Sequence, residues 1–266
     1  MTRLLKRKPE PNSNPPVVYK DKTYQKYHFM HINKTAGHTC HDWLNMTHDI
    51  IFEPGGDAGA HTIVDKFKDD VFYFTIVRNP YDRLASHYFQ WRRNGTFNKK
   101  RISTRSDPEY HIESPDHMIK LLIEGKVPFS NGLAKKKTNS IFCLEDFGAF
   151  EYETNNFLTY KKYKMMMAVD EDYRDLIFLL PCSEWIRDPQ RFKIFKKEKL
   201  HLLEKFFTSG ELKPNIKKHV PLTKDLRNEN TRTKQLDSYK HLFSEESIEF
   251  IKKAYHNDFE IYRYQK

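Results

Sequence analysis

The most constraining feature of the sequence is an unbroken apolar run, VFYFTIV, at residues 71–77. Continuous runs of β-branched and aromatic residues are typical of strands buried on both faces of a parallel sheet. The run ends at Arg78, and Asn79 and Pro80 follow as a helix N-cap and a first helical residue. The stretch therefore predicts a central parallel strand that leads directly into a helix over residues 80–93.

The same order of strand and helix recurs along the chain. We expect Ser114 and Ser244 to be further N-cap residues. The expected strands are 27–32 and 176–181, and the expected helices are 37–46, 115–125, 188–207 and 244–264. Strands that alternate with helices favour an α/β fold with a largely parallel sheet. The predicted fold is therefore a three-layer α/β sandwich, in which helices flank a central, mostly parallel sheet.

The chain has 266 residues, a length that suits one domain or two. Residues 1–23 are basic and rich in Pro and Asn, which predicts a flexible N-terminal segment. No convincing boundary follows, so we expect one domain over 24–266. No apolar run approaches the roughly 20 residues that span a bilayer, and the N-terminus lacks the apolar region of a secretory signal.

Cysteine usage bears on the compartment. Cys40, Cys143 and Cys182 are an odd number at wide spacing, which implies neither a disulfide framework nor a metal site. We expect reduced thiols and a cytoplasmic location. The triplet at 33–35 agrees, because it is a glycosylation sequon within the loop described next, and a glycan would block that loop. If the chain is trimmed from an anchored parent, the Golgi lumen is the expected compartment.

The loop after the expected strand at 27–32 suits an anion. A small-residue turn between a strand and a helix presents backbone N–H groups, and the helix dipole adds to the attraction. Lys34 would add a full positive charge, and Thr35 and Thr39 would add hydroxyl donors. The loop differs from a Walker loop, because its Lys precedes its Gly. The alternative interpretation is an ordinary strand–helix turn.

A second segment supports an anion site. Arg78 follows a buried strand, and Ser86 lies eight residues later on the expected helix. Ligands of open α/β sheets bind at the carboxyl ends of the strands, so Arg78 is placed to hold a second phosphate, with Ser86 as a hydrogen-bond donor. The alternative is a surface salt bridge between Arg78 and Asp82.

Together the two segments, INKTAGHTC and VRNPYDRLASHYF, resemble the PAPS-dependent sulfotransferases. The similarity is closest to the carbohydrate-type branch, which includes the heparan sulfate 2-O and 6-O enzymes, and it covers about residues 27–92. Asn33 stands where the family usually has Pro, and His38 and Cys40 where it usually has Thr and Ser. The resemblance implies a P-loop-like sandwich and a donor, 3′-phosphoadenosine 5′-phosphosulfate (PAPS), that leaves as 3′,5′-ADP.

The resemblance also implies site residues. In the family the first loop binds the 5′-phosphosulfate and the second segment the 3′-phosphate, while a C-terminal loop often closes over the nucleotide. The residues that it assigns to donor binding are Lys34, Thr35, Ala36, Gly37, His38, Thr39, Arg78, Ser86, Thr223 and Lys224. No metal is required, because the sulfuryl group carries a single negative charge.

The expected chemistry is an in-line displacement at sulfur by an acceptor hydroxyl or amine. By resemblance, Lys34 neutralises the charge that develops on the leaving phosphate. His61 follows a Gly-rich turn in the interval where the carbohydrate-type relatives place a catalytic His, and it is the expected general base. His38 and Glu53 are rival candidates. The acceptor is a glycan or a small molecule, and the sequence does not indicate the oligomeric state.

Two other functions stay open. The net charge of +10 and the pI near 9.2 suit a non-catalytic protein that binds polyanions or nucleic acid. The basic runs at 98–105, 134–140 and 193–199 would be its footprint, but no known nucleic-acid-binding signature accompanies them, so we expect no nucleic-acid partner. The other alternative is a P-loop nucleotide kinase, for which the sequence offers no clear Walker lysine or Mg²⁺ ligand.

Overall fold

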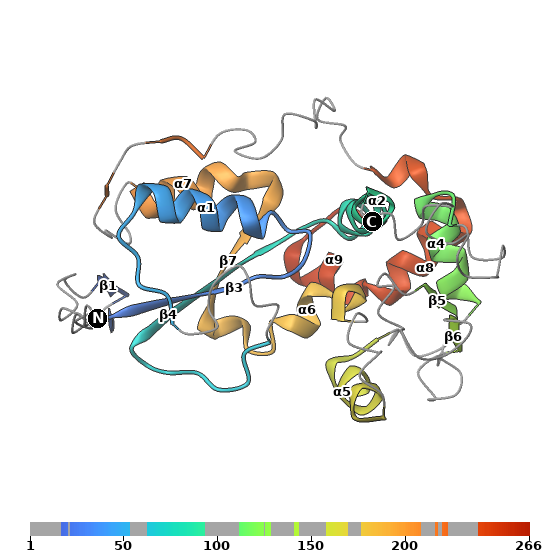
Figure 1. Ribbon diagram of the computed structural model, residues 1–266, viewed down its shortest axis with the longest axis horizontal. Coiled ribbons are helices and arrows are strands. Elements are labelled where there is room, and N and C mark those ends of the chain that lie inside the picture. The colour runs from blue at the N-terminus through green and yellow to red at the C-terminus, as the bar shows by residue number, and fades with distance from the viewer. Residues whose placement is uncertain are drawn as a thin grey trace, which may run out of the picture.

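The computed structural model of the chain is shown in Figure 1. The residues that it describes are 17–20, 22–53, 63–93, 112–124, 126–128, 141–143, 158–169, 177–208, 216–217, 220–222 and 239–266.

Three parallel strands form the central sheet. They are β3 (Lys26–Met30), β4 (Val71–Val77) and β7 (Phe192–Lys196), in the spatial order β3-β4-β7. Every residue of the middle strand is buried, as its continuous apolar sequence requires. The predicted central parallel strand is therefore confirmed, and the α/β class with it.

Helices pack on both faces of this sheet. Helices α1 (Gly37–Thr47) and α7 (Leu200–Thr208) cover one face, which is the upper one in Figure 1. Phe72 and Phe74 of β4 join these helices in one apolar cluster, whereas Tyr73 and Val77 join a second cluster on the opposite face. Alternate side chains of one strand thus supply two cores, which is the expected layered arrangement.

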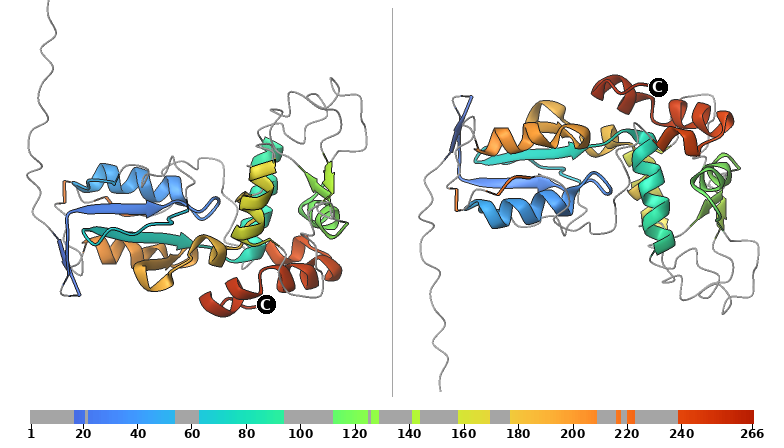
Figure 2. Two further views of the ribbon diagram at one scale, coloured as in Figure 1. Left: turned by 90° about the horizontal axis from the view of Figure 1, so that it is seen from below. Right: turned by 90° about the horizontal axis from the view of Figure 1, so that it is seen from above.

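The second cluster extends into a group of helices beyond the carboxyl end of β4. These are α2 (Pro80–Arg93), α4 (Pro115–Ile123), α8 (Glu245–Ala254) and α9 (His256–Tyr262). In Figure 2, α2 crosses the end of the sheet. The predicted N-caps Asn79, Ser114 and Ser244 are confirmed, because each side chain accepts a hydrogen bond from a backbone N–H of the following turn. The helix predicted over 244–264 is two helices, which part at Tyr255.

The remaining elements are short. They are β1 (Val17–Tyr19), β2 (Lys22–Tyr24), β5 (Lys126–Pro128), β6 (Ile141–Cys143), α5 (Tyr160–Val169), α6 (Cys182–Trp185), η4 (Pro189–Arg191), η5 (Lys197–Lys199) and η6 (Tyr239–Leu242). Strands β1 and β2 form a hairpin within the segment that we expected to be flexible. Tyr19 and Tyr24 anchor it, since each ring lies edge-on to Phe72 at 5.4 Å. Residues 1–16 of that segment lie outside the described residues.

Two predicted elements in the second half of the chain are wrong. Residues 177–179 form a helical turn rather than a strand, and 192–196, expected to be helical, are strand β7. The apolar side chains of 177–180 fill the second core, while the carbonyls of Phe178, Leu179 and Leu180 accept hydrogen bonds from side chains. Strand β7 instead pairs with the open edge of β4, so tertiary pairing outweighs the local helical pattern.

Cys40 and Cys182 are free, buried thiols. Burial raises the pKa of Cys182 to about 12, so it is a packed side chain rather than a reactive one. Within the described ranges, no helix has both the length and the apolar character needed to cross a membrane.

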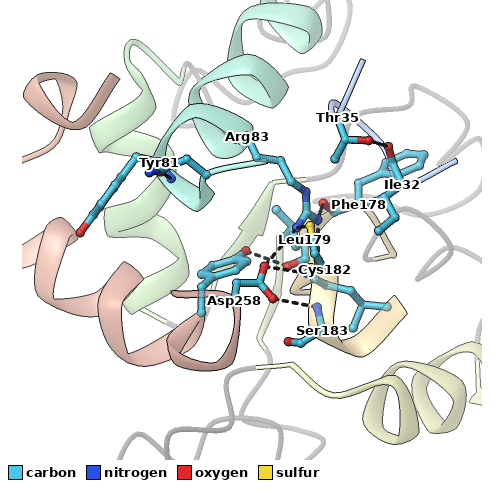
Figure 3. A network of polar contacts seen from close by, with 12 residues as sticks. Ile32, Thr35, Tyr81, Arg83, Phe178, Leu179, Cys182, Ser183 and Asp258 are labelled. Atoms are coloured by element: carbon cyan, nitrogen blue, oxygen red, sulfur yellow. Dashed lines mark hydrogen bonds and ion pairs between the residues drawn. The ribbon is translucent and has the colours of Figure 1, made fainter. Parts of the chain in front are cut away.

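A buried arginine links three distant parts of the chain (Figure 3). Arg83 of α2 donates hydrogen bonds to the Phe178 and Leu180 carbonyls and to Cys182 Sγ, and its Nη1 lies 4.0 Å from Asp258 Oδ2 on α9. The Asp258 carboxylate in turn accepts from the backbone N–H groups of Cys182 and Ser183 at 2.7 Å each. Burial raises the pKa of the Asp258 carboxyl, and Arg83 and these two donors counteract the rise.

We expect Arg83→Met to lower the free energy of unfolding by about 3–5 kcal/mol, because it leaves Asp258 buried without its cation. Urea unfolding followed by circular dichroism measures the loss. The control is Lys252→Ala, which removes an exposed ion pair with Glu249 and should leave the midpoint unchanged. If both variants unfold at the wild-type midpoint, the network around Arg83 does not hold these helices together.

Candidate functional site

The loop between β3 and α1 has the backbone geometry of an anion site. Lys34 and Ala36 both lie in the left-handed region, with φ of 65° and 76°. Turns that contain left-handed residues direct successive N–H groups to one concave side, where anions bind. Ala36 is the N-cap of α1 and makes no side-chain cap, so the positive end of the helix dipole points to the same place.

Gly37 is required by a close approach within this loop. A Cβ at this position would lie 1.8 Å from Cδ2 of His31, so a larger residue would displace the imidazole. His31 is only 2% exposed, it stacks on Phe29, and it meets the His38 ring edge-on at 4.8 Å. The histidine under the loop thus fixes the position of the first turn of α1.

Thr35 stabilises the loop from within. Its side chain is fully buried, and its hydroxyl donates to the Ile32 carbonyl at 2.7 Å (Figure 3). The hydroxyl therefore closes the turn after β3, which differs from its expected use as a donor to a ligand. Thr35 therefore supports an anion site through the shape of the turn rather than through its hydroxyl.

Arg78 lies beside this loop because the strands are parallel. Met30, at the end of β3, pairs with Thr75 of β4, so both chains leave the sheet at the same edge. The Arg78 guanidinium donates to the Lys34 carbonyl at 3.1 Å. The structure thus brings together the two motifs that the sequence separates by more than forty residues.

The Arg78 side chain is a buried cation with few acceptors. It is 7% exposed, its Nε has no hydrogen-bond partner, and among the described residues the Lys34 carbonyl is the one acceptor of its guanidinium. Burial lowers its pKa, and the carboxylates of Asp82 and Glu198 partly offset that effect. Arginine stays charged nonetheless. The alternative of a surface salt bridge does not fit, since the side chain is buried.

The other predicted residues in the described part of the site lie on the two adjoining helices. His38 is exposed and Thr39 is half-buried in the first turn of α1. Ser86 is half-buried on α2, two turns beyond Arg78. Both helices begin at the end of the sheet where Arg78 contacts Lys34.

Three predicted residues lie outside the described residues: His61, Thr223 and Lys224. The flanks of the last two are described. Leu222 packs in the cluster with α1 and α7, and the Tyr239 backbone N–H donates to Asp82 on α2 at 2.7 Å.

Glu53, a rival candidate for the base, is far from the loop. Its carboxylate pairs with Lys68 and, at 3.3 Å, with Lys26, the first residue of β3. The hydrogen bond from Lys68 is the main reason that its pKa is lowered. The loop follows the other end of β3, about 15 Å away for a five-residue strand. Glu53 therefore stabilises the start of β3, at the opposite end of the strand from the Lys34 loop.

Two residues near Arg78 were not anticipated. Glu198 Oε1 accepts from the Asn79 backbone N–H at 3.1 Å, and Glu198 Oε2 accepts from the Tyr264 hydroxyl at 3.2 Å. The sequence carried no signal for these contacts, because 188–207 read as one amphipathic helix.

No group of three or more His, Cys, Asp or Glu side chains in the described part of the chain is arranged to hold a metal.

Comparison with known proteins identifies the family to which the chain belongs. No curated protein and no solved structure matches the chain. The model of the Sulfotransferase family matches residues 17–265, which is nearly the entire chain and includes both motifs of the anion site. The chain therefore belongs to the sulfotransferase family.

Proposed function

We propose that the protein transfers the sulfuryl group of PAPS to a hydroxyl or amine of a carbohydrate or small-molecule acceptor. Membership of the sulfotransferase family supports sulfuryl transfer in general. The observation that carries the specific donor is the contact between Arg78 and Lys34. It sets a buried cation beside an anion-binding turn, as a nucleotide with a 3′-phosphate and a 5′-phosphosulfate requires.

The residues of the site fit such a donor. The left-handed turn at Lys34 and Ala36 and the N-terminus of α1 suit the 5′-phosphosulfate. The guanidinium of Arg78, which has few protein acceptors among the described residues, suits the 3′-phosphate. We propose Ser86, two turns along on α2, as a further hydrogen-bond donor. The backbone carries much of the first contact, which accounts for the tolerance of His38 and Cys40 in place of the usual hydroxyl residues. We propose that Gly37 and Thr39 bind the 5′-phosphosulfate as part of the same loop. We also propose that Thr223 and Lys224, in the segment 223–238, bind the 3′-phosphate.

When bound, PAPS supplies the sulfuryl group and leaves as 3′,5′-ADP. The protein's part at the leaving group is electrostatic. Lys34 places a cation where negative charge grows on the leaving phosphate oxygen, and the N–H groups of the turn stabilise the same charge. Thr35 and Gly37 keep that turn in place, so little reorganisation is needed during transfer.

His61 is the proposed general base. An imidazole nitrogen takes the proton of the acceptor hydroxyl as the oxygen bonds to sulfur, and neutral histidine is suited to this at pH 7. His38 is the remaining rival, because it is exposed at the first turn of α1. We propose no metal ion for this chemistry.

The family branch, domain and compartment extend the proposal. The motifs INKTAGHTC and VRNPYDRLASHYF favour the carbohydrate-type branch. The net charge of +10 suits an acidic glycan, and a small molecule is the alternative acceptor. We propose that the chain from 24 onward is one catalytic domain. The free thiols of Cys40 and Cys182 favour a cytoplasmic location, and a parent with an anchor would place the enzyme in the Golgi lumen.

Donor binding provides the first test. Calorimetry without Mg²⁺ should show tight binding of 3′,5′-ADP and much weaker binding of 5′-AMP and ATP. Arg78→Ala should weaken 3′,5′-ADP roughly 30-fold, the effect of a lost charge-assisted hydrogen bond, and should leave 5′-AMP nearly unchanged. Arg92→Ala, which removes an exposed charge later on α2, is the control. Equal losses for both nucleotides would mean that Arg78 does not read the 3′-phosphate.

Lys34→Ala should lower the turnover number by roughly 100-fold or more, because it removes the cation from the leaving oxygen. The assay follows release of 3′,5′-ADP from PAPS with a screened acceptor. Lys66→Ala, which removes an exposed lysine, should retain full turnover. Near-normal turnover in Lys34→Ala would contradict the assigned role.

His61→Ala should lower turnover by about 100-fold to 10,000-fold while the Kd for 3′,5′-ADP changes by less than about twofold. It should also remove the acidic limb of the pH–rate profile, which reports protonation of the base. His201→Ala, an exposed histidine on α7, serves as the control. Loss of nucleotide binding in His61→Ala would instead make His61 a binding residue.

A further inference from the structure

We infer that Glu198 is a positioning residue of the donor site, which holds Arg78 ready for the 3′-phosphate. The inference rests on the proposed function. Glu198 lies in η5, directly after β7, and its carboxylate joins two separate segments: Asn79 at the start of α2 and Tyr264 after α9. None of the roles considered so far uses this acid.

The parallel register explains how Glu198 reaches this place. Val77 of β4 pairs with Lys196 of β7, and each chain continues for two residues to Asn79 and to Glu198. Past the end of the sheet, the hydrogen bond from the Asn79 N–H to Glu198 Oε1 takes the place of a strand–strand bond. It fixes the backbone directly after Arg78, and therefore the direction in which the Arg78 side chain leaves the strand.

The second oxygen of the carboxylate is oriented by the C-terminal segment. The Tyr264 hydroxyl donates to Glu198 Oε2 at 3.2 Å, and the Tyr264 ring lies under Lys196 Nζ at 4.6 Å. Burial raises the pKa of Tyr264, so its hydroxyl stays a donor at neutral pH. The rotamer of Glu198 is thus held by a residue that itself packs on β7.

A carboxylate beside an anion site repels the anion and weakens its binding unless another effect of the carboxylate compensates. The compensating effect of Glu198 is that it holds Arg78 in place before the donor binds. Arg78 is buried, with few acceptors among the described residues, and the carboxylates of Asp82 and Glu198 partly offset the cost of its burial. Without that compensation the guanidinium would turn toward solvent, and donor binding would have to reorder it. A preordered arginine gives selectivity for the 3′-phosphate rather than greater stability of the fold.

The test measures the selectivity ratio, Kd for 5′-AMP divided by Kd for 3′,5′-ADP, by calorimetry on the full chain. Glu198→Ala should lower the ratio about tenfold, the effect of a lost hydrogen bond to a charged group. Glu198→Gln keeps an oxygen acceptor for the Asn79 N–H but loses the charge that partly offsets the burial of Arg78, so its ratio should fall between those of Glu198→Ala and wild type. Tyr264→Phe removes one hydroxyl without disturbing the ring and should lower the ratio by a smaller factor.

Glu260→Ala is the matched control, since it removes an exposed glutamate on α9 that pairs with Lys266, and its ratio should equal that of wild type. An unchanged ratio in both Glu198→Ala and Tyr264→Phe overturns the inference alone. A higher ratio in Glu198→Ala also overturns it, since the carboxylate would then merely oppose the phosphate. A wild-type ratio near one overturns the proposed donor, and the inference with it.

Discussion

The parallel pairing of β3 with β4 is the constraint on which the rest of the site depends. It makes both chains leave the sheet at one edge, where the left-handed turn at Lys34 meets the guanidinium of Arg78. Neither segment alone distinguishes an anion site from an ordinary turn or a surface charge. Their contact favours the anion site that we propose, because it sets a buried cation beside a turn of the anion-binding kind.

The two arginines of the segment RNPYDR have different surroundings and therefore different roles. Arg83 donates to three acceptors and lies near Asp258, so it fastens α2 to α6 and α9. Arg78 has far fewer acceptors in the described structure, which is why we propose it as the ligand-binding arginine. The buried ionic network beneath α2 thus holds in place the helix that begins two residues after Arg78 and carries Ser86.

The electrostatic design of the site is mixed rather than uniformly positive. In the proposed donor site, Lys34, Arg78 and the N-terminus of α1 are positive, whereas the Glu198 carboxylate near Arg78 accepts from the backbone at Asn79. A site made of cations alone would bind any polyanion. A site in which an acid fixes the direction of one arginine can select a particular phosphate.

The sequence by itself determined the βα units at 71–93 and around the Lys34 loop, because a continuous apolar strand, an Asn-Pro N-cap and a small-residue turn are local signals. It also predicted Lys34, Gly37 and Arg78 as anion-site residues from their types, and that assignment stays a prediction. Only the tertiary structure decided that 192–196 is the third strand and that 177–180 is not. That choice depends on which segment pairs with the free edge of β4 and which fills the second core. The same holds for Arg83, Glu198 and Glu53, whose partners lie far away in the chain, so no local pattern specifies them.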